Sequence, residues 1–352
     1  NDQFAISSIT DAYGVLSLFE YDDFGRLTRL SLNVGAEEST FAYDSAGGVT
    51  ITDASGNETQ VWLNDRGQPG RIIDANGEVL RLFYDDDGNL TRTIAPDGSL
   101  TTFEYDNAGN LLRQLDAAGQ ATSFSYEPTF NQLTNVTDAR GNGMDYSYDD
   151  QGNLLAITYA DGSSETFGYD DEGNVTTSVN RRGQDFDYTY NDRGQLLRQE
   201  NPDGTVFEYA YDARGNMTSA TDSRGATTME YDAADRLTKI TYPTGRFLQY
   251  SYDAGGRRSQ MVDQDGNTIN YAYDAAGRLA GLTDENNTQI VAYTYDNIGR
   301  LIREDNGNDT YTTYTYDALG NIVNLVNYAP DGSVNSRYDY TYDDVGLQTS
   351  MT

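Results

Sequence analysis

The residues able to do chemistry in this chain are carboxylates, hydroxyls, amides, tyrosines and arginines. Its 352 residues include no histidine and no cysteine, and the one lysine among 23 basic residues is Lys239. A Ser-His-Asp triad, a thiol nucleophile and a cysteine-held zinc or iron-sulfur site are therefore excluded. Lys239 lies between Thr238 and Ile240, which also excludes a phosphate-binding loop built on Gly-Lys-Ser/Thr.

Adjacent carboxylates are the first candidates for catalysis, because a glycosidase acid and base need no other residue type. Such runs occur at residues 85–87, 149–150 and 170–172. Each run occupies the same place in a repeated pattern, whereas a catalytic pair should be an exception to that pattern. We therefore predict that the chain is not an enzyme, and we expect no cofactor.

Calcium is the second possibility, because carboxylate and amide oxygens alternate at Asp263, Asp265 and Asn267 and again across residues 85–89. The start resembles an EF-hand loop, but the Glu expected at the twelfth position is replaced by Asp274. Aspartates that stabilise turns are the preferred interpretation, with no metal site, and calcium binding is the alternative.

The overall charge argues against nucleic acid as a partner. With 56 acidic residues the net charge is −33, and the sequence pI is about 4.1. Affinity for nucleic acid depends on Lys and Arg neutralising phosphates, so this chain would be repelled. The apolar runs are only a few residues long, so no membrane-spanning helix is expected.

A repeat explains most of the composition. Tyr-Asp recurs at spacings of 20 to 22 residues, with one interval of 26 before the last copy, and three variant units (at residues 63, 126 and 190) fill the gaps to make sixteen units. The in-register tyrosines are Tyr21, Tyr43, Tyr84, Tyr105, Tyr148, Tyr169, Tyr211, Tyr231, Tyr252, Tyr273, Tyr295, Tyr316 and Tyr342. We predict a single array over residues 1–352, without a domain boundary.

Each unit predicts a β-hairpin, as in residues 103–111. An aromatic residue two before the Tyr gives the period of two that is typical of a strand, and we expect the rings to stack across neighbouring strands. Asp then opens a turn that ends in Gly, and a second apolar strand follows. A second turn of Asp/Gly or Pro-Asp-Gly type, as at residues 53–56 and 96–98, leads to the next unit. The predicted fold is all-β: a continuous antiparallel meander with about two strands per 21 residues.

The pattern Tyr-Asp-x-x-Gly-Asn/Arg-Leu resembles the YD repeat of the RHS family, which includes Rhs proteins, Tc-toxin shell subunits, wall-associated proteins and teneurins. The resemblance covers residues from about Phe19 to about Leu347. It implies a sheet wound spirally into a shell or tube wall. Members that carry a toxin end in an Asp-Pro-containing core, and no Asp-Pro dipeptide occurs here, so neither a protease nor a toxin is assigned.

The repeat signature supplies the site residues that we predict to be structural, with no catalytic, cofactor or metal role. They are Tyr84, Asp85, Gly88, Tyr105, Asp106, Gly109, Tyr148, Asp149, Gly152, Tyr169, Asp170, Gly173, Tyr211, Asp212, Gly215, Tyr273, Asp274, Gly277, Tyr295, Asp296, Gly299, Tyr316, Asp317 and Gly320. Of the 56 acidic residues, 24 lie in Tyr-Asp turns, which makes the acidity a by-product of turn chemistry.

The predicted function is that of a structural protein, secreted or at the cell surface, that forms the wall of a shell. The alternative is a surface adhesin or self-assembling filament that presents carbohydrate- or protein-binding loops. Two unpaired end strands would be left, so we expect a segment of a larger shell or a subunit of an assembly. Its partners would be further repeats or other copies through those edge strands, and an enclosed cargo or a surface glycan or protein.

Overall fold

A computed structural model describes residues 6–11, 15–32, 36–343 and 346–352 as strands joined by turns. These ranges contain no helix long and apolar enough to cross a membrane. The chain divides into two compact units, the first made of residues 1–83, 93–99 and 250–352 and the second of residues 84–92 and 100–249.

The strands in chain order are β1 (Ser8–Thr10), β2 (Leu16–Tyr21), β3 (Leu27–Leu32), β4 (Ala36–Tyr43), β5 (Gly48–Asp53), β6 (Glu58–Leu63), β7 (Pro69–Ile73), β8 (Val79–Tyr84), β9 (Leu90–Ile94), β10 (Leu100–Tyr105), β11 (Leu111–Leu115), β12 (Ala121–Tyr126), β13 (Leu133–Thr137), β14 (Gly143–Tyr148), β15 (Leu154–Tyr159), β16 (Ser164–Tyr169), β17 (Val175–Val179), β18 (Asp185–Tyr190), β19 (Leu196–Glu200), β20 (Val206–Tyr211), β21 (Met217–Asp222), β22 (Gly225–Tyr231), β23 (Leu237–Thr241), β24 (Phe247–Tyr252), β25 (Arg258–Asp263), β26 (Thr268–Tyr273), β27 (Leu279–Thr283), β28 (Gln289–Tyr295), β29 (Leu301–Asn306), β30 (Tyr311–Tyr316), β31 (Ile322–Tyr328), β32 (Val334–Tyr342) and β33 (Gln348–Met351).

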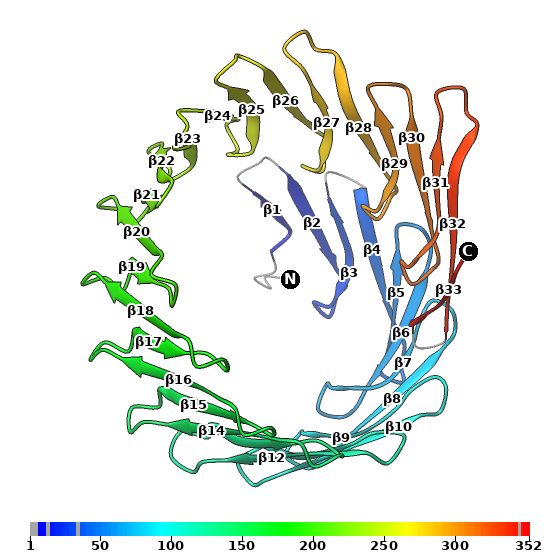
Figure 1. Cartoon of the computed structure of the whole chain (residues 1–352). Helices are drawn as coiled ribbons and strands as arrows, with labels where there is room; N and C mark the ends of the chain where they lie inside the picture. The colour runs from blue at the N-terminus through cyan, green and yellow to red at the C-terminus, as the bar shows by residue number, and fades with distance from the viewer. Residues whose placement is uncertain (1–5, 12–14, 33–35, 344–345) are drawn as a thin grey trace. The chain divides into compact units, whose positions relative to one another are not determined.

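Neighbouring strands in the sequence are neighbours in the sheet (Figure 1). β11, for example, pairs antiparallel with β10 on one side and with β12 on the other. At the C-terminal end, β32 pairs with β31 through its first six residues and with β33 through its last three. The prediction of an antiparallel meander with two strands per repeat is confirmed.

Most units are closed by two turns of the same construction. We call the turn after the signature Tyr the signature turn, and the turn that leads to the next unit the return turn. In the signature turn 106–110, the Gly109 amide donates to the Asp106 carbonyl at 3.1 Å and the Asp106 amide donates to the Asn110 carbonyl at 3.0 Å. Return turn 138–142 repeats both bonds at 2.9 and 3.0 Å. Gly109 has φ +85°, in the region where glycine avoids a Cβ clash.

A β-bulge accompanies most signature turns. Glu104 lies opposite Arg113 while Tyr105 lies opposite Leu111, so Leu112 is the extra residue. The extra leucines are exposed, at 38% for Leu112 and 38% for the equivalent Leu155. The sequence pattern does not reveal these bulges, since Leu112 and Leu155 look like ordinary strand residues.

The sheet buries few side chains completely. Among hydrophobic residues only Val291 and Val326 fall below a tenth exposed, at 7% and 3%, in the part of the chain that the structure describes. Most other strand residues are half-buried. Contacts between successive hairpins must therefore supply much of the stability.

Two glycines in one return-turn hairpin allow the effect of backbone strain on stability to be distinguished from the effect of side-chain packing. Gly141 has φ +81° and open space where a Cβ would lie, whereas Gly143 lies outside the positive-φ region and its Cβ would make ordinary contacts of 3.6 Å with Asn135 and Thr137. We expect Gly141→Ala to lower the free energy of unfolding by about 1–2 kcal/mol, through left-handed strain alone. The matched control Gly143→Ala should be close to neutral. Urea denaturation compares them, and equal losses would contradict the strain argument.

Candidate functional site

The signature Asp organises its own turn. Asp106 Oδ1 accepts hydrogen bonds from the amides of Ala108 and Asn110 at 2.8 and 2.9 Å, and Oδ2 accepts one from Asn110 Nδ2 at 2.9 Å. Asp149 makes the same three bonds with Gln151 and Asn153. Both carboxylate oxygens are thus engaged inside the turn.

These bonds lower the pKa of the carboxyl groups. The side-chain bond from Asn110 is the largest cause that lowers the pKa of Asp106, followed by the backbone amide of Asn110. The pKa of Asp149 is lowered in the same way by Asn153. The turns therefore favour the ionised form of each Asp, which is the form that accepts all three bonds.

The two loops considered for calcium, at residues 85–89 and 263–267, follow this rule. Asp85 accepts the amides of Asp87 and Asn89 at 3.0 and 2.8 Å. Asp263 accepts the amides of Asp265 and Asn267, both at 2.9 Å. Across residues 6–11, 15–32, 36–343 and 346–352, no group of three or more acidic side chains is arranged to hold a metal ion. Turn stabilisation accounts for the oxygen spacing that suggested a calcium loop.

The signature Tyr links its hairpin to the preceding one. Tyr169 donates its hydroxyl to the carbonyl of Leu154, the first residue of β15, at 2.7 Å. Partial burial raises the pKa of Tyr169, with the Asp149 carboxylate as a second cause, so the hydroxyl remains a donor at neutral pH. The same bond recurs along the chain, from Tyr43 to Leu27, Tyr126 to Leu111, Tyr148 to Leu133, Tyr211 to Leu196, Tyr231 to Met217, Tyr273 to Arg258, Tyr295 to Leu279, Tyr316 to Leu301 and Tyr342 to Ile322.

Arginine adds a second link where it replaces Asn at the end of the signature turn. Arg278 Nε donates to Asp274 Oδ2 at 2.7 Å, and its guanidinium lies 4.6 Å from the ring centre of Tyr295 in the next unit. Arg300 binds Asp296 at 2.6 Å and lies 4.7 Å from the ring centre of Tyr316. Cation–π contact and ion pair thus join neighbouring units through one side chain. Arg26 and Arg257 make the equivalent contacts, and Arg236 makes the ion pair.

The repeat units match those of known protein families. The teneurin YD-shell family model matches residues 2–180 and 164–311, and the RHS-repeat model matches residues 295–334. The chain belongs to the teneurin YD-shell family. No curated protein sequence matches it.

Solved structures share the fold of this YD-shell chain. The crystal structures of TcdB2-TccC3-Cdc42 and TcdB2-TccC3-TEV match with TM-scores of 0.67 and 0.66, at 19% and 18% identity over 96% of the chain. The Photorhabdus luminescens Tc holotoxin pore with a mutated TccC3 matches with a TM-score of 0.60, at 16% identity over 95%. The chain spans 22% of the length of each of these relatives.

The predicted signature residues of the YD-shell chain occupy equivalent places. Each of the eight tyrosines is the last residue of its strand, each Asp opens the turn, and the eight glycines have φ between +82° and +103°. What the sequence reasoning missed is the acceptor of the Tyr hydroxyl, a backbone carbonyl about 15 residues earlier. The spacing of 14 to 16 residues from the signature Tyr back to an acceptor residue that is Leu in most units was the available signal.

The expected ladder of stacked rings is not the recurring contact. Tyr311 and Tyr328 stack, with ring centres 4.4 Å apart. From unit to unit, however, the tyrosines repeat hydroxyl–carbonyl bonds and arginine–ring contacts.

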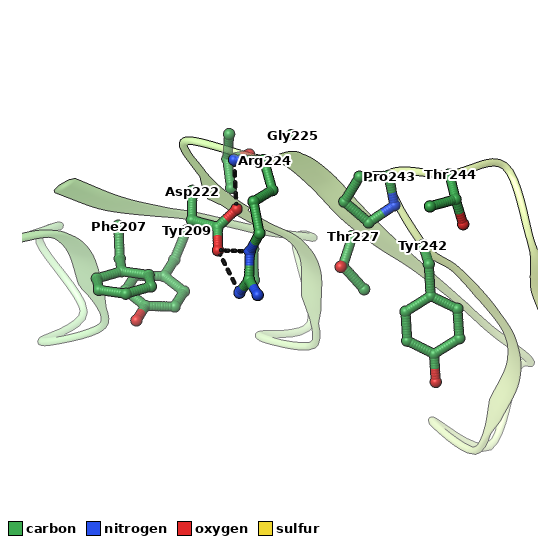
Figure 2. A pocket seen from close by; sticks show the side chains of 11 residues that line it. Phe207, Tyr209, Asp222, Arg224, Gly225, Thr227, Tyr242, Pro243 and Thr244 are labelled. Atoms are coloured by element: carbon green, nitrogen blue, oxygen red, sulfur yellow. Dashed lines mark hydrogen bonds and ion pairs between the residues drawn. The ribbon is translucent and has the colours of Figure 1, made fainter. Parts of the chain in front are cut away.

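One return turn departs from the pattern and leaves a hollow. Asp222 pairs directly with Gly225, so the turn between β21 and β22 has two residues. A hollow of about 590 Å³ lies beside it, lined by Phe207, Tyr209 and Tyr242 among others. Figure 2 shows Arg224 held by Asp222 within this hollow, with bonds of 2.9 and 2.6 Å to one carboxylate oxygen. Trp62, the only tryptophan of the chain, lies elsewhere and has the Arg71 guanidinium 4.8 Å from its ring centre.

Removing one signature hydroxyl tests the link between hairpins. We expect Tyr169→Phe to lower the free energy of unfolding by about 1 kcal/mol, because the Leu154 carbonyl loses its donor. Tyr146 is the matched control, since no hydroxyl bond involves it within the described ranges. Chemical denaturation of both Tyr→Phe variants gives the comparison. Equal losses would show that the ring, and not the hydroxyl, provides the stability.

The lowered pKa values of the signature aspartates predict sensitivity to acid. A group whose pKa is lower in the folded state stabilises the fold at neutral pH, and this contribution is lost as the pH falls below about 4. The thermal midpoint should therefore drop steeply between about pH 4 and pH 2.

A variant that keeps an acceptor for the two backbone amides of the turn but cannot titrate provides the control. Asn191 opens a natural signature turn and accepts the amides of Arg193 and Gln195 at 3.0 and 3.1 Å. D106N/D149N/D170N should accordingly show a shallower loss of the midpoint with acid. A slope identical to that of the parent chain would refute the assignment.

Proposed function

We propose that this chain is a structural segment of the wall of a YD-repeat shell, without catalysis of its own. The observation that carries the proposal is the repeated link between hairpins, in which a Tyr hydroxyl reaches the carbonyl of the preceding unit over most of the chain. A chain tied at most of its repeats in this way forms one continuous surface rather than a set of separate hairpins. Membership of the YD-shell family and the fold shared with Tc-toxin structures support the same function.

The signature residues are structural under this proposal. Their polar atoms are occupied by turn amides, by neighbouring side chains and by backbone carbonyls, as Asp106 and Tyr169 illustrate. A wall of this kind is suited to a secreted or surface location, where a strongly acidic surface keeps it soluble. Because the chain spans about a fifth of the Tc structures that it matches, further repeats or other chains would complete the enclosure.

A second candidate is the adhesin, and one observation favours it. The hollow beside Arg224 combines three aromatic rings with hydroxyls and a charged pair, which is the mixture that sugar rings recognise. Binding of labelled oligosaccharides that is lost on Tyr242→Ala would support this candidate. A glycan array without hits would leave the wall as the sole proposal.

Small-angle X-ray scattering tests the wall. A compact globule of 352 residues has a radius of gyration of about 20 Å. We expect a clearly larger radius and a scattering profile with a depleted centre, recorded at about 1 M salt so that charge-driven association is suppressed. A radius near 20 Å would contradict the wall, and a rod-like profile would favour the filament.

A further inference from the structure

Tyrosine is the residue through which this chain can form a covalent cross-link under oxidising conditions. The chain has no cysteine and therefore no disulfide, whereas it has 29 tyrosines. Two phenol rings that each lose one electron and one proton can join through a carbon–carbon bond. Coupling of this kind is efficient only between rings that the fold already holds together.

Tyr311 and Tyr328 meet this requirement. They lie directly opposite each other on the neighbouring strands β30 and β31. Their ring centres are 4.4 Å apart and the ring planes differ by 14°, so the two rings are stacked. Residues directly opposite each other in an antiparallel pair have Cα atoms about 4.5–5.5 Å apart, which keeps the rings close even when they turn about χ2.

The stacked pair does not belong to the repeat pattern. Tyr314 and the signature Tyr316 point to one face of β30, and Tyr311 is an odd number of residues away, on the opposite face. Tyr316 donates its hydroxyl to the Leu301 carbonyl, as most signature tyrosines do to the preceding hairpin. In the part of the chain that the structure describes, the hydroxyls of the stacked pair make no such bond to a backbone carbonyl. The link between hairpins therefore does not explain this pair.

Arg303 holds Tyr311 from the side opposite to Tyr328. Its guanidinium lies 3.9 Å from the ring centre of Tyr311 and binds the carboxylate of Asp305 at 2.6 and 2.9 Å. The Tyr311 ring thus has a fixed cation against one face and the Tyr328 ring against the other. This arrangement limits the separation of the two tyrosine rings.

The stack lies at the open end of its hairpin. Tyr311 is the first residue of β30 and Tyr328 is the last residue of β31, so the pair is at the end away from the signature turn 317–321. Both side chains are half-buried, and the Tyr311 hydroxyl is 3.9 Å from the position that a Cβ on Gly332 would take. A small diffusible oxidant can therefore reach the rings.

We propose that Tyr311 and Tyr328 form a site of oxidative cross-linking that takes a one-electron oxidant as its co-reactant. Each phenol loses one electron to the oxidant and its hydroxyl proton to water, which leaves a phenoxyl radical on each ring. The radicals pair to form one bond between the Cε carbons, ortho to the hydroxyls, and the hydrogens on those carbons move to the oxygens to restore both phenols. Two equivalents of oxidant are each reduced by one electron, and the protein loses two hydrogen atoms.

The cross-link closes residues 311–328 into a covalent loop that contains the signature turn. A covalent loop restricts the unfolded chain, as a disulfide does, so the link stabilises the hairpin in a chain without cysteine. The inference goes beyond the proposed wall and does not depend on it, because oxidation is measured on the single chain.

Oxidation of the 352-residue chain by photochemically generated ruthenium(III) tris-bipyridine tests the site. At low protein concentration we expect dityrosine fluorescence on a chain that stays monomeric in denaturing gels. Cleavage before aspartate separates the two tyrosines into peptides 309–316 and 317–330. The linked pair should have the summed mass of both peptides less two hydrogen atoms and should be the most abundant dityrosine product. Absence of this pair, or another pair as the main product, would overturn the proposal.

Phenylalanine variants assign the cross-link to individual residues. Tyr311→Phe and Tyr328→Phe each remove one phenol and keep the ring, and each should lower the yield of the linked peptides by about tenfold or more. Tyr314→Phe is the matched control, because Tyr314 is in the same peptide but on the opposite face of β30. It should give the yield of the parent chain. Losses of equal size in all three variants would contradict the assignment.

Oxidation in concentrated urea distinguishes the effect of the fold from that of the sequence. In the unfolded chain the two rings do not begin in contact, so the linked peptides should make up a much smaller share of the total dityrosine. An unchanged share would overturn the proposal, and it would leave the wall untouched, since scattering tests the shape of the chain. Far-UV circular dichroism establishes that each variant is folded. If one is not, the parent chain with and without urea decides the question.

Discussion

The structure depends on one hydrogen bond, from the hydroxyl of the signature Tyr to a backbone carbonyl of the preceding hairpin. Tyr169 and Leu154 show what this bond requires. The Tyr must be the last residue of its strand, so that its ring reaches back toward the preceding hairpin, and the Asp-x-x-Gly turn must follow at once. The bulge opposite the Tyr sets the local twist of that strand end. Tyr, Asp and Gly are therefore constrained together, which explains why they recur as a group.

A sheet with so few fully buried side chains has to distribute its stability along its length. Each hairpin touches mainly the hairpin before it and the hairpin after it, as in repeat proteins whose stability is a sum of unit and nearest-neighbour terms. Arg278 shows how one side chain can stabilise several units. Its guanidinium contacts Asp274 of its own turn, the Tyr295 ring of the next unit and Glu37, which lies 241 positions earlier in the chain. Where Asn replaces Arg, as at Asn110, the turn keeps its internal bonds, and the shorter side chain reaches the next unit only through a hydrogen bond of 3.3 Å from Asn110 Nδ2 to Asn131 Oδ1.

The acidic residues of the chain fall into two groups with different roles. The first Asp of a signature turn is internal chemistry, since its oxygens accept amide bonds, as Asp106 does. The second and third turn residues, such as Asp150 and Asp171, are exposed and give the surface formed by the signature turns its negative charge. Composition counts both groups alike. Only the positions in space separate the carboxylates that hold turns from those that remain available to a partner.

The sequence by itself determined the all-β meander, the number and spacing of the units, the positive-φ glycines and the signature residues, because period-two patterning and turn chemistry act over a few neighbouring residues. It also predicted that Asp85 and Asp263 serve turns. The structure alone decided the acceptor of the Tyr hydroxyl, the bulge at Leu112, the hollow beside the short turn at Asp222, and the contact between Glu37 and Arg278. Those features join residues from 15 to 241 positions apart, or follow from a shift in strand register, and local sequence patterns carry no information about which distant turns come into contact.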